Sequence, residues 1–187
     1  MIFHYKTLFL IIISLFIWFT QPAFSLKETQ HNKSTDKYSI LYILLASGLS
    51  MIFSVTEWAY FTNQSANIIM SIIGVIMIIG GLILRTWAIK TLDRFFTATV
   101  RIKQEQHLIK QGPYAIVKHP AYTGAFFSIT GVPVFLNDNV SIYISALLLG
   151  IAYYIRIGEE EKVLLNYFGN EYREYSKHVK KFLPFIW

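Results

Sequence analysis

Cysteine is absent from this chain of 187 residues, so structural disulfides, thiolate zinc sites and cysteine nucleophiles are all excluded. Charged residues are scarce as well, at 15% of the chain, whereas hydrophobic residues make up 54% and aromatic residues 17%. Soluble domains usually contain about 45 to 50% apolar residues, so this composition is typical of an integral membrane protein.

Charge is missing altogether from three long windows, each close to the ~20 residues that cross a hydrocarbon core. They lie at residues 7–26, 38–56 and 67–84. Two further apolar runs, residues 121–136 and 140–155, are separated only by an Asn-Asp-Asn triplet and predict a tight helical hairpin whose ends lie on the same side. We therefore predict an all-α fold, a polytopic membrane helix bundle of about five segments in which the last two form a short hairpin.

Basic residues are unevenly distributed along the chain. The connections at residues 61–66 and 137–139 contain no lysine or arginine, whereas the segment before the hairpin and the tail after it contain many. Because basic loops tend to stay in the cytoplasm, the central segment and the C-terminal tail are both predicted to be cytoplasmic and able to meet. The net charge of +6 has the same explanation, so nucleic acid is not an expected partner.

The N-terminus resembles a secretory signal peptide, because Lys6 precedes an apolar run that ends in Ala23-Phe24-Ser25, a pattern with small residues at the first and third positions of a cleavage site. Cleavage after this run would leave the basic central segment on the outer side. A retained first segment instead makes Lys27, Lys33 and Lys37 cytoplasmic, in agreement with the other basic segments. We therefore expect the first segment to be retained.

Two ionisable residues, Glu57 and Arg85, lie within or at the edge of the apolar windows, where charge is costly unless it reaches an interface or a polar cavity. Arg85 lies about one turn from Lys90, so it either snorkels to the cytoplasmic headgroups or lines a cavity. Glu57 lies toward the outer end, and we expect it to be an interfacial residue rather than a catalytic one.

Residues 112–124 read GPYAIVKHPAYTG, a polar stretch that leads into the hairpin. Its Gly-Pro pair ends any preceding helix, and Pro120 biases His119 away from the α region. The stretch therefore predicts a shaped loop that delivers backbone amides, two phenol rings and an imidazole to the cytoplasmic mouth of the bundle. The alternative is a purely structural membrane-entry turn, in which the tyrosines are interfacial anchors and Lys118 meets phosphate.

The second polar stretch, residues 156–175, reads RIGEEEKVLLNYFGNEYREY. In a helix Arg156 and Glu160 share a face, which on its own predicts an ordinary ion pair. Apolar residues recur at helical spacing behind the carboxylates and predict an amphipathic helix that lies along the membrane interface. These apolar residues are Val163, Leu164, Tyr167 and Phe168.

The order of the motifs is similar to that of a known family of membrane enzymes. The series consists of Arg85 near the end of a membrane helix, LDRFFT at 92–97, GPYAIVKHPAYTG at 112–124, RIGEEEKVL at 156–164, FGNEYREY at 168–175 and LPFI at 183–186. This series resembles the isoprenylcysteine carboxyl methyltransferase family. Two departures are visible: Lys118 stands where the family commonly has arginine, which keeps the charge but loses the planar fork, and Asp93 stands where it commonly has glycine.

The resemblance extends over residues 80–187, whereas the first 80 residues contribute only hydrophobicity. We therefore predict a single integral membrane domain over residues 1–187. Residues 1–80 form its N-terminal membrane helices, and residues 81–187 form a family-like catalytic region with a cytoplasmic cofactor pocket made by the central loop and the C-terminal helix.

The resemblance implies an integral membrane enzyme that uses S-adenosylmethionine to methylate a carboxylate on a lipid-modified cysteine. The implied partners are the lipid bilayer and a lipophilic carboxylate substrate. The resemblance also implies a set of cofactor-binding residues and two catalytic residues nearest the reacting centre. The cofactor-binding residues are Tyr114, His119, Pro120, Tyr122 and Glu160, and the catalytic residues are Arg156 and Glu161.

This chemistry fits the residue types. A C-terminal carboxylate, with a reference pKa of about 3.3 to 3.7, is ionised at neutral pH and attacks a sulfonium methyl group without a general base. Alignment of the two bound partners can account for ~7 to 11 kcal/mol of the barrier. Arg156 is the natural partner of the carboxylate, because guanidinium binds carboxylates through a planar fork. A metal is not expected, since His107 is the one nearby candidate to join His119 as a ligand.

Three other functions fit parts of the sequence. Membrane phospholipid methyltransferases, which act on an amine, share a similar C-terminal pattern. Membrane sterol reductases, which bind a nicotinamide cofactor, carry a similar His-Pro-x-Tyr-x-Gly element but usually have more membrane spans. A non-enzymatic membrane scaffold would bind neither cofactor. Residue usage is compatible with a bacterial inner membrane, where the acceptor could also be a small lipophilic acid or a thiol-linked isoprenoid.

Overall fold

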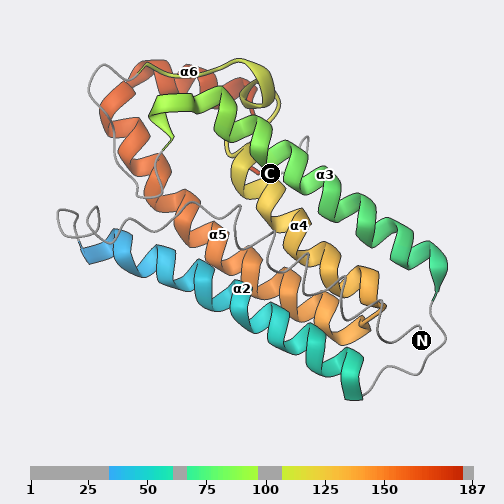
Figure 1. Ribbon diagram of the computed structural model, residues 1–187. Helices are drawn as coiled ribbons and strands as arrows, with labels where there is room; N and C mark the ends of the chain where they lie inside the picture. Colours follow the sequence, from blue (N-terminus) through green and yellow to red (C-terminus); the bar gives the residue numbers. More distant parts are fainter. Residues whose placement is uncertain (1–33, 61–66, 97–106, 183–187) are drawn as a thin grey trace.

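The computed structural model describes residues 34–60, 67–96 and 107–182. They form helices α2 (Ser34–Tyr60), α3 (Ile68–Leu92), α4 (Pro120–Leu136), α5 (Asn139–Phe168) and α6 (Asn170–His178), with short 3-10 turns at Asp93–Phe95 and Gly112–Ala115. The four long helices lie side by side in the order α2, α5, α4, α3, and α6 lies at one end of the bundle (Figure 1). Within the described residues the extended structure is limited to one isolated bridge between Val117 and Lys180. The predicted all-α class is confirmed.

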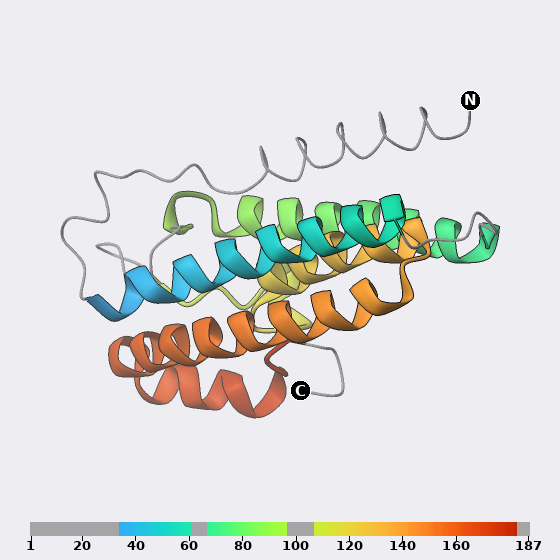
Figure 2. The same cartoon turned by 90° about the horizontal axis from the view of Figure 1, so that it is seen from below.

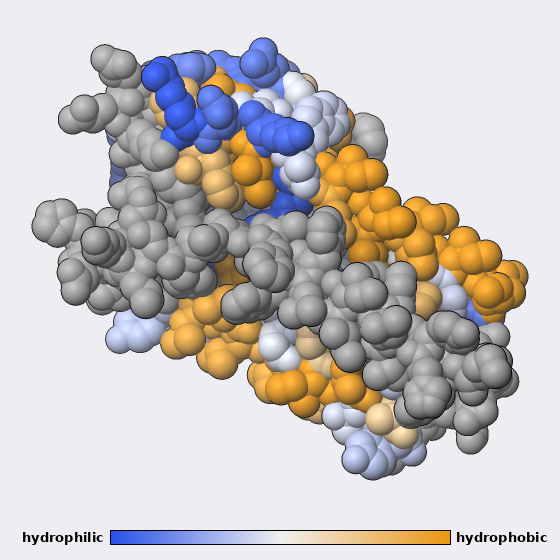
Figure 3. Space-filling model, in the orientation of Figure 1, coloured by the Kyte–Doolittle hydropathy of each residue, from blue (hydrophilic) through white to orange (hydrophobic). Residues whose placement is uncertain are grey.

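Three of these helices are long and apolar enough to cross a membrane: residues 38–60, 68–95 and 139–168. Helix α4, with 17 residues, is apolar but shorter. Apolar residues line the outer side of α3, and hydrophilic residues gather at the end of the bundle that carries α6 (Figure 3). The predicted segment at residues 7–26 lies outside the described residues, so the count of five segments stays a prediction.

The predicted hairpin is confirmed, although its second helix is longer than expected. Helix α4 ends at Leu136, and the left-handed backbone of Asn137 (φ 67°) turns the chain into α5. Helix α5 continues into the second polar stretch as far as Phe168, so residues 156–168 are not a separate interfacial helix. At Gly169 (φ 54°) the chain turns, and α6 runs back beside the second half of α5 (Figure 2).

The turn at the far end of the bundle is held by side chains that accept hydrogen bonds from the free backbone N–H groups at the starts of helices. Glu57 at the end of α2 accepts hydrogen bonds from the backbone N–H groups of Val140 (3.1 Å) and Ser141 (2.6 Å) in the first turn of α5. Asn137 accepts a bond from the Asn67 N–H (3.1 Å) at the start of α3. Glu57 therefore joins α2 to α5 at the end of the bundle opposite the polar stretches.

Helices α3 and α4 approach each other closely enough to need glycine at their contact. A Cβ atom on either Gly81 or Gly124 would lie 2.5 Å from the carbonyl oxygen of the other residue. A Cβ on Gly124 would also lie 2.7 Å from the backbone nitrogen of Arg85. Small residues allow this close backbone approach in membrane bundles, and here it brings Arg85 against the first turns of α4.

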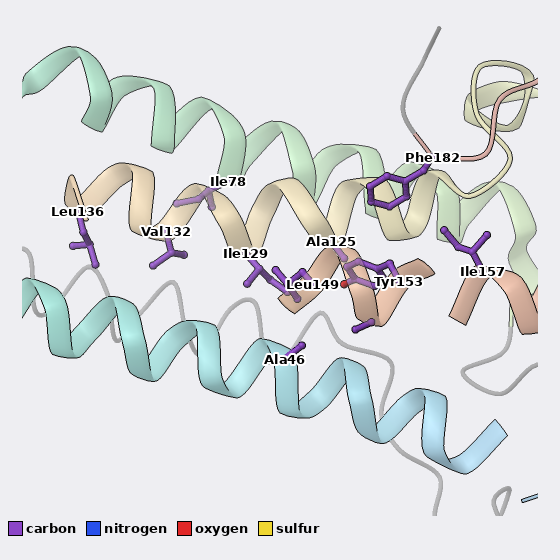
Figure 4. Packing of buried hydrophobic residues seen from close by; sticks show 11 residues of the cluster. Ala46, Ile78, Ala125, Ile129, Val132, Leu136, Leu149, Tyr153, Ile157 and Phe182 are labelled. Atoms are coloured by element: carbon purple, nitrogen blue, oxygen red, sulfur yellow. The ribbon is translucent and has the colours of Figure 1, made fainter. Parts of the chain in front are cut away.

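The apolar core lies between the four long helices and includes a residue from the C-terminal segment. Ile78, Ile129, Leu136 and Leu149 are buried along its length (Figure 4). Phe182, which follows α6, packs with its ring 5.4 Å from that of Phe126 and 6.1 Å from that of Tyr153. The C-terminal segment is thus fixed to the core close to the polar end of the bundle.

Candidate active site

The two polar stretches meet at the end of the bundle where α4 begins. The carbonyl oxygen of His119 accepts the first hydrogen bonds of α4, and Tyr122 then lies within that first turn. The Tyr122 hydroxyl donates to Glu160 Oε2 (2.7 Å) on α5. The imidazole of His119 lies 3.9 Å from Glu160 Oε1 through Nδ1 and 3.7 Å from Glu161 Oε1 through Nε2. The predicted juxtaposition of the GPYAIVKHPAYTG and RIGEEE stretches is therefore observed.

Arg156 lies at the centre of a buried hydrogen-bond chain that joins three helices. Only 2% of this residue is exposed. Its Nε donates to the Tyr122 hydroxyl oxygen (3.1 Å) on α4, and its Nη1 donates to Ser39 Oγ (2.8 Å) on α2. Because Tyr122 accepts from Arg156 and donates its own proton to Glu160, the chain runs without interruption from Ser39 to Glu160.

Glu161 is held by donors from three other elements. Lys118 Nζ lies 2.5 Å from Oε1 and Lys181 Nζ lies 2.8 Å from Oε2, while the Tyr172 hydroxyl donates to Oε1 (3.3 Å). Burial and the neighbouring carboxylate of Glu161 raise the pKa of Tyr172 far above its ordinary value, so the phenol keeps its proton and stays a donor. Glu161 thereby connects α5 to the loop, to α6 and to the C-terminal segment.

Lys118 behaves as a compact point charge rather than as a planar fork. Its ammonium group contacts Glu161, donates to Ser176 Oγ (3.3 Å) and lies 5.5 Å from the centre of the Tyr172 ring. An ammonium group with three rotatable donors suits such scattered partners. Lys118 is buried, so the interpretation of this residue as a phosphate contact at a membrane-entry turn is wrong.

The C-terminal segment runs along the loop and completes this side of the site. The backbone N–H groups of Lys118 and His119 donate to the carbonyl oxygens of Lys180 (2.8 Å) and Lys181 (3.1 Å). The Thr123 hydroxyl donates to the Phe182 carbonyl oxygen (2.6 Å). The predicted meeting of the central segment with the C-terminal tail is thus observed down to individual backbone bonds.

Tyr114 and Pro120, two of the predicted cofactor residues, have contacts of a different kind. The Tyr114 hydroxyl donates to the Ala88 carbonyl oxygen (3.4 Å) on α3, and its own carbonyl accepts from the Tyr175 hydroxyl (2.6 Å) on α6. Tyr114 is therefore buried between two helices rather than anchored at a membrane interface. Pro120 is buried as the first residue of α4, where its missing N–H costs no hydrogen bond. Their contact with a cofactor stays a prediction.

Arg85 is directed into the protein. It is 5% exposed, and its Nη1 donates to the Ala121 carbonyl oxygen (3.1 Å) in the first turn of α4. Of the two predicted possibilities for Arg85, snorkelling to the headgroups is therefore wrong. Arg85 lies beneath the same turn of α4 that carries Tyr122, which adds a second buried guanidinium to this end of the bundle.

Sequence reasoning missed three residues that take part in the site. Tyr172 lies in the FGNEYREY motif, from which the sequence predicts no role for this tyrosine. Lys181 and Ser39 carry no local signal, because each meets its partner only through the folding of distant segments. Among the described residues, no group of three histidine or acidic side chains is arranged to hold a metal ion, and the His107 ring packs against that of Phe95 at 5.0 Å.

Comparison with known proteins gives consistent matches. A model of the isoprenylcysteine carboxyl methyltransferase (ICMT) family matches residues 66–166. Protein-S-isoprenylcysteine O-methyltransferase B of Arabidopsis thaliana is 33% identical over 176 residues, which cover 91% of this chain and 89% of the relative. The protein-S-isoprenylcysteine O-methyltransferase of Saccharomyces cerevisiae is 30% identical over 166 residues, which cover 88% of this chain and 67% of the relative.

A solved structure shows the same arrangement of helices. It is that of the eukaryotic intramembrane Ras methyltransferase ICMT, with a TM-score of 0.69 and 28% sequence identity. The match covers 96% of this chain and 63% of that chain, so this protein spans a little less than two thirds of the length of the solved one. The likeness therefore includes α2, which lies outside the residues that the family model matches.

Proposed function

Because the chain belongs to the isoprenylcysteine carboxyl methyltransferase family, we propose that it is a membrane enzyme that transfers a methyl group from S-adenosylmethionine to the carboxylate of a lipophilic, isoprenylcysteine-like acceptor. One observation carries the proposal most directly: the buried guanidinium of Arg156 is fixed from two sides at the point where the two family stretches meet. The names of the matched relatives all describe transfer of a methyl group to oxygen of isoprenylcysteine.

The proposed role of Arg156 is to bind and orient the acceptor carboxylate. A guanidinium group presents donors in a plane that matches the two carboxylate oxygens, and it remains charged at every working pH. The carboxylate is already ionised at neutral pH, so no side chain has to remove a proton from it. The contribution of the protein is therefore alignment and exclusion of water, which fits a cationic residue held by fixed hydrogen bonds inside a helix bundle.

The residues beside Arg156 fit S-adenosylmethionine, which supplies an electrophilic methyl group on a sulfonium when it is bound. Nε2 of His119 is buried and, among the described residues, has no partner within hydrogen-bond distance, since Glu161 Oε1 lies 3.7 Å away, so a polar ligand would satisfy it. The Glu160 side chain is 30% exposed and presents a carboxylate that suits an ammonium group or ribose hydroxyls. We assign cofactor binding to His119 and Glu160, with Tyr122, Tyr114 and Pro120 as further residues of the same wall.

The proposed role of Glu161 follows from its contacts. Its carboxylate neutralises Lys118 and Lys181 and accepts from Tyr172, so it holds the loop and the C-terminal segment together around His119. In this position Glu161 supports the reacting centre by keeping its walls in place. Arg156 carries the direct contact with the acceptor.

We also propose that the end of the bundle with the site faces the cytoplasm, together with the C-terminus. The basic residues of the described loop and tail gather at this end, as the positive-inside tendency predicts. The two relatives named above come from a plant and a yeast, so a bacterial inner membrane stays a prediction from residue usage.

Two measurements on the detergent-purified protein test this function. S-Adenosylmethionine and NADPH are titrated separately, and we expect saturable binding of the first alone. Binding of NADPH alone would support a reductase, and binding of neither would support a scaffold. Methyl transfer is then compared between an N-blocked S-farnesyl-cysteine and phosphatidylethanolamine as acceptors. We expect methylation of the carboxylate, at a rate that is flat around neutral pH, whereas transfer to the amine alone, rising with pH as the amine loses its proton, would contradict the proposal.

A further inference from the structure

The hydroxyl oxygen of Ser39 has a partner on another helix, whereas three later serines of α2 bond within α2. Ser47, Ser50 and Ser54 each donate to the carbonyl oxygen four residues earlier in their own helix, at 2.7, 2.7 and 2.8 Å. Such bonds back to the preceding turn are ordinary for serine in a helix. Ser39 is 1% exposed, and its oxygen accepts from Arg156 Nη1, which belongs to a helix more than a hundred residues away in sequence.

The contact with Ser39 removes a rotation that the contact with Tyr122 leaves open. A hydrogen bond at Nε alone holds one point of the guanidinium group of Arg156 and lets its plane tilt about the Nε–H···O direction. The second bond, from Nη1 to Ser39 Oγ, fixes the orientation of the guanidinium plane. Recognition of a carboxylate by a planar fork depends on that orientation, and small misalignments of reacting groups lower rates strongly.

We infer that Ser39 is a positioning residue for the acceptor carboxylate, which it aligns by fixing the guanidinium plane of Arg156. The inference rests on the proposed function, and it adds to the site a residue of α2, outside residues 66–166 that the family model matches. Helix α2 thereby acts as a third wall of the site rather than only as a membrane anchor.

The test uses variants that change the hydroxyl group with little change in volume. Ser39→Cys replaces the oxygen with a weak sulfur acceptor, whereas Ser39→Thr keeps a hydroxyl oxygen. Ser50→Cys is the matched control, since Ser50 is equally buried on the same helix but bonds only to its own helix among the contacts described. We expect Ser39→Cys to lower kcat/KM for an N-blocked S-farnesyl-cysteine roughly 10-fold, the usual scale of a lost bond to a charged group. Its affinity for S-adenosylmethionine should match that of the wild type, as should the kinetics of Ser39→Thr and Ser50→Cys.

The possible outcomes separate this inference from the proposed function. A wild-type protein that forms no methyl ester contradicts the proposed function, whatever the variants do. With an active wild type, equal kinetics of Ser39→Cys and Ser50→Cys would overturn the inference, as would a parallel loss of acceptor and S-adenosylmethionine affinity, which indicates general damage. If Ser39→Cys unfolds at a lower temperature than Ser50→Cys, the Ser39→Thr variant decides the question. Wild-type acceptor kinetics of Ser39→Thr support the inference. A lower kcat/KM of Ser39→Thr together with a wild-type unfolding temperature overturns it.

Discussion

Tyr122 is the residue that ties the two family stretches together, because its hydroxyl group both accepts from Arg156 and donates to Glu160. The sequence predicted a role for Tyr122 only through the family resemblance. Its spacing from its two partners gives no hint of contact, since they lie 34 and 38 residues away. The structure adds that one phenol oxygen orients a cation and a carboxylate at the same time.

We expect Tyr122→Phe to lower kcat/KM for the carboxylate acceptor by roughly 10- to 100-fold. The change removes two hydrogen bonds to charged groups, each worth about 1.5 to 3 kcal/mol, and the expected factor corresponds to the loss of one such contribution at the transition state. Initial rates of methyl ester formation measure the effect. Tyr143→Phe is the control, because Tyr143 is 77% exposed on α5. Equal rates for the two variants would show that the Tyr122 hydroxyl has no part in the reaction.

Glu161→Gln tests the ionic contacts that close the site. The change leaves the buried ammonium of Lys118 without its carboxylate, so we expect the free energy of unfolding in detergent to fall by about 3 kcal/mol. Glu174→Gln removes an ion pair with Lys177 that is exposed on α6, and no measurable change is expected from it. Similar unfolding curves for both variants would contradict the assignment of Glu161 as the residue that holds loop and tail together.

At the scale of elements, the hairpin was predictable and the length of α5 was not. The Asn-Asp-Asn triplet marked the turn because two apolar runs flank it directly. The polar sequence from Arg156 to Glu161 looked like the end of an apolar segment, yet α5 continues to Phe168. The reason is that these charged side chains find partners on α2, α4 and the C-terminal segment, which a hydropathy window cannot register.

The close contact between α3 and α4 gives a prediction about the stability of glycine variants. In Gly81→Ala the new Cβ would lie 2.5 Å from the Gly124 carbonyl oxygen, so the helices must separate. We expect the free energy of unfolding to fall by about 1 to 3 kcal/mol, the usual range for overpacking. Gly80→Ala, one residue away with nothing within 4 Å, should be neutral or up to about 1 kcal/mol stabilising, because alanine favours a helix over glycine. Equal stabilities would show that the two helices do not need this close approach.

Helix α6 and the 3-10 turn before α4 predict how stability depends on pH. Burial raises the pKa of Tyr114, Tyr172 and Tyr175 far above the ordinary value of about 10. In the unfolded chain these phenols lose their protons above about pH 10, while the folded protein keeps them, so the stabilisation is present below that pH and is lost as pH rises. The midpoint temperature of thermal unfolding in detergent should therefore fall steeply as the pH rises above 10 for the wild type, and less steeply for Tyr172→Phe. An equal slope for Tyr172→Phe would contradict the raised pKa of this group.

At the scale of the whole molecule, the sequence predicted which segments meet but not how three helices share one arginine. The distribution of basic residues predicted that the central loop and the tail lie at the same end of the bundle, and the Val117–Lys180 bridge shows that they touch. The contribution of α2 could not be predicted, because a serine in an apolar run carries no sign of its partner. A site at the junction of α2, α4 and α5 places charged groups inside the bundle.

The central claim is that Arg156 binds an acceptor carboxylate for methyl transfer, and mass spectrometry of the product tests it most directly. The purified protein is incubated with S-adenosylmethionine carrying a deuterated methyl group and with an N-blocked S-farnesyl-cysteine. We predict a base-labile deuterated methyl ester from the wild type and a loss of at least about 100-fold in Arg156→Ala, as expected when one partner of a buried charge pair is removed. The unfolding midpoint and S-adenosylmethionine binding of the variant confirm that it is folded. An Arg156→Ala protein that forms the ester at the wild-type rate would contradict the account.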